Sequence, residues 1–191
     1  MKLAAGESVY HGAIKQFTPE KKSGFIACDA IYAEAGQEVY AYQDVLEKAM
    51  AGPGDYVAFF IHWSSRGQPQ ASNPMIRLGC SDGMFALKGT YKPGKDPTGF
   101  GFLDCPPTKE YFGRDIYVHK DLAVTMTPGE TYRFNAYLNR DNMPNASEAE
   151  PCEPEWEPIP TDLTEFRRVE VDGKGKSKGG KGKGGKGGKG G

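Results

Sequence analysis

An internal repeat is the feature of this 191-residue chain that most restricts its fold. When the sequence is displaced by 77 positions, residues of the same type or character align in order. The matches are Gly12 with Gly89, Lys15 with Lys92, Gly24 with Gly101, Phe25 with Phe102, Cys28 with Cys105, Tyr40 with Tyr117 and Asp44 with Asp121. The displacement then becomes 75, as a two-residue deletion in a loop would produce. We therefore predict two copies of one small domain, at residues 8–77 and 84–150.

Each copy is predicted to contain five short strands, which in the first copy lie near residues 9–17, 23–28, 37–42, 54–63 and 69–78. Five strands in so small a unit favour closure into a barrel, which leaves no exposed sheet edge. Residues 43–50 are predicted to form a short helical turn. Residues 151–172 are an acidic, proline-rich extension. Within it we expect a strand over residues 161–172 that docks Leu163, Phe166 and Val169 on the second barrel.

Two stretches of the second copy place aromatic side chains at alternate positions. Residues 98–103 read Thr-Gly-Phe-Gly-Phe-Leu, and residues 115–119 read Asp-Ile-Tyr-Val-His. Because successive side chains of a strand point to opposite faces, Phe100 and Phe102 share one face, as do Tyr117 and His119. These rings either complete a hydrophobic core or form an outer platform on which unpaired bases stack. We favour the platform, because the aliphatic residues between the rings supply the opposite face.

The fourth strand of the first copy also alternates. Val57 and Phe59 are predicted to face the core, and Trp63 has the same parity, which favours a core or core-edge role over base stacking. His62 and its counterpart Tyr137 have the outward parity, so they would widen a binding face.

Both copies resemble the cold-shock domain. Members of that family read approximately Gly-x-Val-Lys-Trp-Phe, Lys-Gly-Phe-Gly-Phe-Ile and Asp-Val-Phe-Val-His. The first copy has Gly-Ala-Ile-Lys-Gln-Phe at 12–17, Lys-Ser-Gly-Phe-Ile at 22–26 and Glu-Val-Tyr-Ala-Tyr at 38–42. The resemblance implies an all-β chain of two tandem five-stranded OB-type barrels that bind single-stranded RNA or DNA. Carried over position by position, it implies nucleic-acid binding by Lys15, Phe17, Lys21, Phe25, Tyr40, Tyr42, Lys92, Phe100, Phe102, Tyr117 and His119.

The chain departs from the family pattern at several of these positions. The tryptophan of the first strand is replaced by Gln16 and Pro93, and the first phenylalanine of the second motif is Ser23 in the first copy. Tyr42 stands where the second copy keeps His119. Since each stacked base contributes about 1–3 kcal/mol, we expect the second copy, with more rings, to bind more strongly. Because the two copies are linked in one chain, a nucleic acid bound to one copy has a high effective concentration at the other. This linkage would compensate for weak binding by each copy alone.

Charge is unevenly distributed along the chain. Residues 173–191 hold seven lysines, eleven glycines and one serine, so a net charge of −1 for the whole chain leaves −8 on residues 1–172. We expect this tail to be disordered. It either attracts phosphates or only keeps the protein soluble. An acidic body opposes nucleic-acid binding, because phosphate neutralisation usually dominates affinity.

Other classes of function have little support in the sequence. The four cysteines have no Cys-x-x-Cys spacing, the three histidines are scattered, and no phosphate loop or nucleophile motif is present. We expect no enzyme activity, no cofactor, no metal and no membrane span, and a cytoplasmic or nuclear protein with reduced thiols. The predicted role is that of an RNA chaperone or a regulator of transcription or translation. The alternative is a protein-interaction module built on degenerate cold-shock barrels, with the acidic, proline-rich segment as a second contact.

Overall fold

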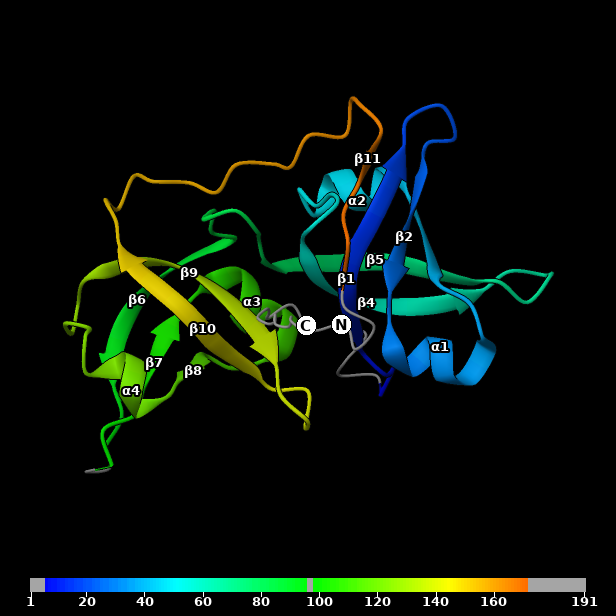
Figure 1. The fold of residues 1–191 in the computed structure, drawn as a ribbon. Coiled ribbons are helices and arrows are strands. Elements are labelled where there is room, and N and C mark those ends of the chain that lie inside the picture. The colour runs from blue at the N-terminus through cyan, green and yellow to red at the C-terminus, as the bar shows by residue number, and fades with distance from the viewer. Residues whose placement is uncertain (1–5, 96–97, 172–191) are drawn as a thin grey trace, which may run out of the picture.

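The computed structural model describes residues 6–95 and 98–171 of the chain. It consists of two strand-rich units that lie side by side (Figure 1). The first unit contains β1 (Tyr10–Thr18), β2 (Ser23–Ala27), α1 (Asp29–Ala35), β3 (Val39–Tyr42), α2 (Gln43–Lys48), β4 (Tyr56–Trp63) and β5 (Pro69–Gly79). The second contains β6 (Leu87–Pro93), β7 (Gly101–Asp104), α3 (Pro106–Phe112), β8 (Ile116–Val118), α4 (Lys120–Ala123), β9 (Thr131–Leu138) and β10 (Pro144–Pro151). A two-residue strand, β11 (Arg167–Arg168), follows.

Both units have the same strand order. In the first, the sheet runs β1-β2-β3-β5-β4, and a pairing between β1 and β4 closes the ring. In the second, β6-β7-β8-β10-β9 form a closed barrel through the pairing of β6 with β9. The third and fifth strands of each unit are parallel and the other pairs antiparallel. The predicted fold class, two five-stranded OB-type barrels in an all-β chain, is confirmed.

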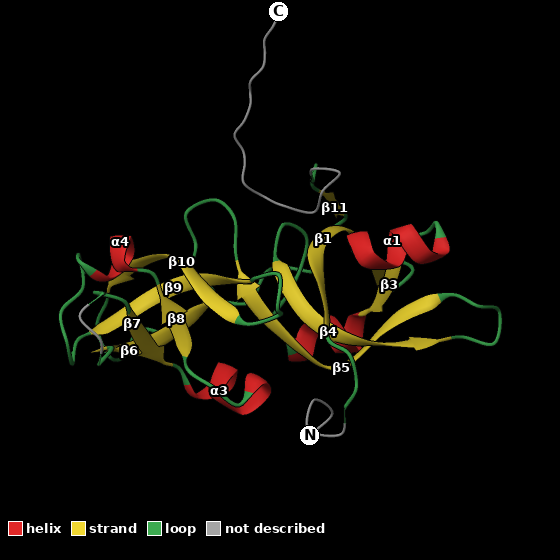
Figure 2. Ribbon diagram, turned by 90° about the horizontal axis from the view of Figure 1, so that it is seen from below, coloured by secondary structure: helices red, strands yellow, loops and turns green. Residues whose placement is uncertain are grey.

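A short helix follows the second strand in each unit, and the sequence analysis did not predict it. In α1 and α3 the residue before the helix is a buried cysteine, Cys28 or Cys105. Each helix ends at a glycine in the left-handed conformation, Gly36 (φ 69°) or Gly113 (φ 78°), which glycine adopts at no steric cost. In Figure 2, α1 lies above the strands of the first unit and α3 lies below those of the second. The predicted helical turn at 43–50 is confirmed as α2.

The interior of each barrel is filled by inward-facing side chains. In the first, these include Ile14, Phe17, Ile26 and Phe59, all fully buried. In the second, they include Tyr91, Leu103, Ile116, Val118 and Phe134. Because side chains on strands alternate, the opposite face of each strand is free to meet solvent or another element.

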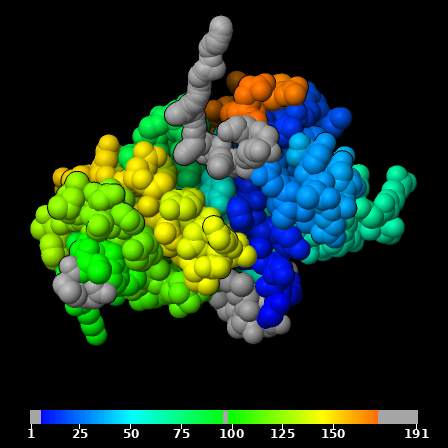
Figure 3. All heavy atoms as spheres, turned by 60° about the horizontal axis from the view of Figure 1, so that its bottom comes forward, coloured from blue at the N-terminus to red at the C-terminus, as the bar shows by residue number. Residues whose placement is uncertain are grey.

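The central part of β4, residues 57–60, is buried on both faces, because its outer face meets the second barrel. Ala58 and Phe60 belong to the same apolar cluster as the second barrel's core, together with Ile76 and Leu78 of β5. The Tyr111 hydroxyl donates a hydrogen bond across this interface to the Pro74 carbonyl at 2.6 Å. In the space-filling view, the yellow atoms of the β9–β10 region lie against the blue atoms of the first unit (Figure 3). The second barrel's core therefore extends across the junction to the outer faces of β4 and β5, whereas the interior of the first barrel forms a separate apolar cluster.

The C-terminal extension docks on a different barrel from the one predicted. After β10 the chain crosses back to the first barrel, where β11 pairs with β1 and Leu163 packs against the first barrel's core (Figure 1). Phe166, expected to dock on the second barrel, is 59% exposed. The docking site is therefore the first barrel and not the second. The glycine–lysine tail, and with it the expected disorder, lies outside the described residues.

Trp63 is also placed differently from the expectation. It has the inward parity of Phe59, but its side chain is 44% exposed. The β4–β5 hairpin extends beyond the body of the barrel, so the last inward positions of β4 have no core above them (Figure 1).

None of the helices formed by the described residues has the length and apolar character needed to cross a membrane. Within the same part of the chain, no group of three or more metal-ligating side chains is close enough to hold an ion. All four cysteines are free thiols.

Candidate nucleic-acid interface

Three aromatic rings form a cluster on the outside of the second barrel. The Phe100 ring stacks on Tyr117 with centroids 5.5 Å apart and planes 24° apart. Phe102 meets both rings edge-on, with its centroid 5.4 Å from Phe100 and 6.3 Å from Tyr117. All three side chains are half-buried, and they cover one another rather than a core. The predicted sharing of one face is confirmed, and base binding by these rings stays a prediction.

Strand register produces this cluster. Phe102 lies opposite Tyr117 across the β7–β8 pair and opposite Lys92 across the β6–β7 pair. Directly opposed residues of neighbouring strands have side chains on the same face, which brings these three together. Gly101, between the phenylalanines, points inward, where an added Cβ would collide with the Tyr91 ring. This glycine therefore makes room for Tyr91 inside the barrel rather than uncovering the backbone outside.

His119 lies beyond the end of β8 and is exposed. Its Nδ1 accepts a hydrogen bond from the Asp121 backbone N–H at 3.2 Å, so the ring caps the N-terminus of α4. It has no ring contact among the described residues, in contrast to Phe100 and Tyr117.

The lysines of this face are paired with carboxylates. Asp115 lies 2.9 Å from the Lys92 ammonium and 3.3 Å from that of Lys109. Partial burial raises the pKa of Asp115, but hydrogen bonds from both lysines outweigh this effect and hold the pKa below its ordinary value. The carboxylate thus stays ionised and cancels part of the positive charge that Lys92 would offer to a phosphate.

A groove of about 640 Å³ opens beside the rings. Phe102 and Tyr117 form part of its wall, and the other lining residues are Lys109, Gly113, Arg114, Asp115, Asn139, Met143, Pro144 and Asn145. Arg114 is exposed and has no ion pair within residues 6–95 and 98–171. Asn145 stands opposite Tyr117 in the β8–β10 pair. The sequence analysis did not assign these polar residues to a site, because they come from two segments, 109–115 and 139–145, that only the closed barrel brings together.

The first barrel has a smaller aromatic face at the equivalent place. The Phe25 and Tyr40 rings are edge-on with centroids 4.7 Å apart, and both are half-buried. Tyr42 is 39% exposed, and its hydroxyl accepts a hydrogen bond from the Gln70 amide at 3.3 Å. The Gln70 carbonyl oxygen is 2.8 Å from His62 Nε2. Polar side chains therefore extend this ring pair along the face.

Phe17 does not belong to either face, which corrects its assignment as a nucleic-acid-binding residue. Its side chain is 0% exposed and lies in the core of the first barrel. The cause is an irregularity in the β1–β2 register between Ile14 and Gln16, which places an extra residue, Lys15, in β1. A bulge of one residue reverses the facing of every side chain after it, so Phe17 turns inward.

The bulge also changes which residues of the two copies correspond. Gln16 lies opposite Phe25 as Lys92 lies opposite Phe102, so Gln16 and not Lys15 is the spatial counterpart of Lys92. The Lys15 ammonium instead pairs with Glu38 at 2.7 Å. Lys21 is exposed in the turn between β1 and β2.

The fold and these faces define the class of protein: two OB-type barrels in series, each with aromatic side chains on its outer surface. No protein-family model matches the chain, and no curated protein matches it. A solved structure of cold-shock domains of Drosophila Unr aligns with 16% identity and a TM-score of 0.29. That alignment covers 80% of this chain and 66% of the Unr chain, slightly less than two thirds of its length. The OB-type fold of the two barrels follows from their strand order and ring closure.

Proposed function

We propose that this chain binds single-stranded RNA or DNA by stacking bases on the outer aromatic faces of its two barrels. It would act without catalysis, as an RNA chaperone or a regulator of transcription or translation, in the cytoplasm, the nucleus or both. One observation carries the proposal: Phe100, Phe102 and Tyr117 contact one another outside a barrel whose interior is already filled. Such rings are available to unpaired bases, and each stacked base contributes about 1–3 kcal/mol.

The groove beside the rings supports the same function. Its wall combines the two rings with amide side chains and the exposed Arg114. An unpaired base offers a flat π-face and polar edges, so a site for it needs a ring to stack on and nearby hydrogen-bonding groups. Phe102, Tyr117 and Asn145 supply these two elements side by side.

A protein-interaction module is the second candidate, and the charges favour it. Residues 1–172 sum to −8, and Asp115 engages Lys92 and Lys109 on the aromatic face. A protein partner with an apolar or basic surface would meet less repulsion there than a phosphate backbone.

Binding of labelled single-stranded RNA and DNA oligonucleotides to the full chain, followed by fluorescence anisotropy, separates the two candidates. The informative variant is Phe102→Ala, and the matched control is Tyr32→Ala, which removes an exposed ring from α1. We expect Phe102→Ala to weaken binding by about 1–3 kcal/mol and Tyr32→Ala to leave it unchanged.

Two results would contradict the proposal. Wild-type protein that binds neither oligonucleotide would favour the protein-interaction module. A large loss of melting temperature in Phe102→Ala together with unchanged binding would mean that this ring serves the fold alone.

A further inference from the structure

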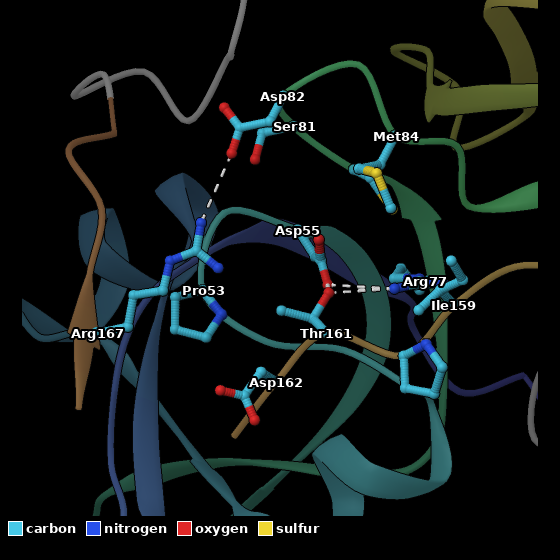
Figure 4. Close-up of a pocket in the computed structure, with 12 residues that line it drawn as sticks. Pro53, Asp55, Arg77, Ser81, Asp82, Met84, Ile159, Thr161, Asp162 and Arg167 are labelled. Carbon is cyan, nitrogen blue, oxygen red and sulfur yellow. Dashed lines mark hydrogen bonds and ion pairs between the residues drawn. The ribbon is translucent and has the colours of Figure 1, made fainter. Parts of the chain in front are cut away.

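Buried polar and apolar contacts attach the C-terminal extension to the first barrel. Thr161 is the anchor: its hydroxyl donates to Asp55 Oδ2 at 2.7 Å and accepts from Arg77 Nη1 at 3.2 Å (Figure 4). Asp55 and Arg77 are themselves an ion pair at 3.6 Å with side chains 4% and 2% exposed. Leu163 follows and packs on the barrel core. The position of the next residues is therefore fixed by buried contacts.

Strand β11 then pairs with the part of β1 that β4 leaves open. β4 pairs with Tyr10–Ala13, whereas β11 places Arg167 opposite Phe17 and Arg168 opposite Gln16. The Val169 N–H donates to the Lys15 carbonyl at 2.8 Å and extends this pairing. The second barrel has no such strand among the described residues, and the equivalent position of β6 is Pro93, which lacks an N–H donor.

The register assigns the two arginines to opposite faces. Phe17 is fully buried, so its neighbour Gln16 points outward, and Arg168, opposite Gln16, points outward with it. The outer row of the first barrel therefore runs across the paired strands, from β11 to β4, as Arg168, Gln16, Phe25, Tyr40, Gln70 and His62. Arg167 has the other parity and forms an ion pair with Asp82 at 3.7 Å (Figure 4).

We propose that β11 is part of the nucleic-acid interface and that Arg168 contacts a phosphate of the strand stacked on Phe25 and Tyr40. Arg168 is exposed and has no ion pair in the described part of the chain. In the outer row it is separated from Phe25 only by Gln16, which stands where members of the cold-shock family have a tryptophan. The Lys15 ammonium of the same barrel is paired with Glu38, so Arg168 is the better placed cation. A guanidinium matches the geometry of a phosphate and remains charged at all working pH values.

The described chain ends at Val171, three residues after Arg168, and the seven lysines of residues 173–191 follow in the sequence. The strand that carries Arg168 is therefore the described strand nearest in sequence to these lysines.

The test compares Arg168→Gln with Arg167→Gln in the full chain, since the two residues differ in face but not in strand or charge. Affinity for a labelled single-stranded oligonucleotide is measured between 50 mM and 1 M salt. One phosphate contact contributes about 0.7 to the slope of log affinity against log salt, so Arg168→Gln should flatten the slope by about that amount. At the lowest salt concentration this corresponds to a loss of roughly 3- to 10-fold. We expect Arg167→Gln to bind like the wild type.

The inference depends on the proposed function, and the outcomes keep the two apart. Equal binding by wild type, Arg168→Gln and Arg167→Gln, with Phe102→Ala impaired, would overturn the role of Arg168 and leave the proposed function standing. Equal losses in both arginine variants would also overturn it, because the effect would then be one of general charge. No oligonucleotide binding by the wild type would overturn both.

Discussion

Phe60 of β4 and Tyr111 of α3 stack across the junction of the two barrels, with ring centroids 5.8 Å apart and planes 27° apart. Phe60 is 2% exposed although it lies on the outer face of its own barrel. The second barrel thus completes the burial of the first. This contact is one of several at the junction, together with the Tyr111–Pro74 hydrogen bond and the apolar residues Ala58, Ile76 and Leu78.

We therefore predict that Phe60→Ala destabilises the whole described fold. Truncation of a buried phenylalanine to alanine costs about 3–5 kcal/mol, because the transfer free energy of the ring is lost and a cavity remains. The free energy of unfolding, measured in denaturant, should fall by that amount, whereas Tyr32→Ala, an exposed position, should change it little. Two separate unfolding transitions in the wild type would contradict the coupling of the two barrels through this junction.

A second contact at this junction predicts a dependence on pH. The Tyr56 hydroxyl is 2.8 Å from His11 Nδ1 and also accepts the Leu138 N–H at 3.3 Å, which links β1 to β9. Burial lowers the pKa of His11 below 6.5, and the Asp29 carboxylate offsets this only in part. The unfolded chain therefore binds the proton more readily, so stability is present above pH 6.5 and falls as the pH decreases below that value.

The measurement is the melting temperature at pH 7.5 and at pH 5.5 for wild type, His11→Gln and His119→Gln. We expect His11→Gln to reduce the difference between the two pH values. His119→Gln, at an exposed position, should retain it. If all three proteins show the same difference, His11 does not control the acid response.

The two aromatic faces should differ in strength. We predict that Phe102→Ala weakens oligonucleotide binding by the full chain more than Phe25→Ala does. Phe102 belongs to a three-ring cluster beside a groove, whereas Phe25 has one ring partner, Tyr40. Parallel titrations at one salt concentration measure this. Equal losses, or a larger loss for Phe25→Ala, would mean that the cations near the first barrel outweigh the number of rings.

Removal of residues 173–191 should change the salt dependence more than the base preference. If three to five of the seven lysines contact phosphates, the slope of log affinity against log salt should flatten by roughly 2 to 3.5. Base preference should survive, since phosphate contacts do not read sequence. The comparison of full-length and truncated protein across a salt series decides the matter. An unchanged slope would assign the tail a solubilising role only.

Much of the fold could be predicted from local pattern. Alternation along Gly101–Asp104 and Ile116–Val118 separates outer rings from inner aliphatic residues, and the structure has both sets on the predicted faces. The spacing of the repeat gave the strand content of both barrels, because each strand is a local periodicity bounded by turn residues. These features need no knowledge of distant parts of the chain.

Three features were decided only in the tertiary structure. Phe17 faces inward because of one extra residue in β1, and strict alternation cannot reveal a bulge. Phe60 is buried because a second barrel covers β4, a contact between segments far apart in sequence. Arg168 lies beside the first barrel's face because β11 pairs with the part of β1 that β4 leaves unpaired. The second barrel, which directly precedes β11 in the sequence, does not bind this strand within the described residues. Sequence periodicity determines which face of a strand a residue occupies, but what meets that face depends on long-range packing.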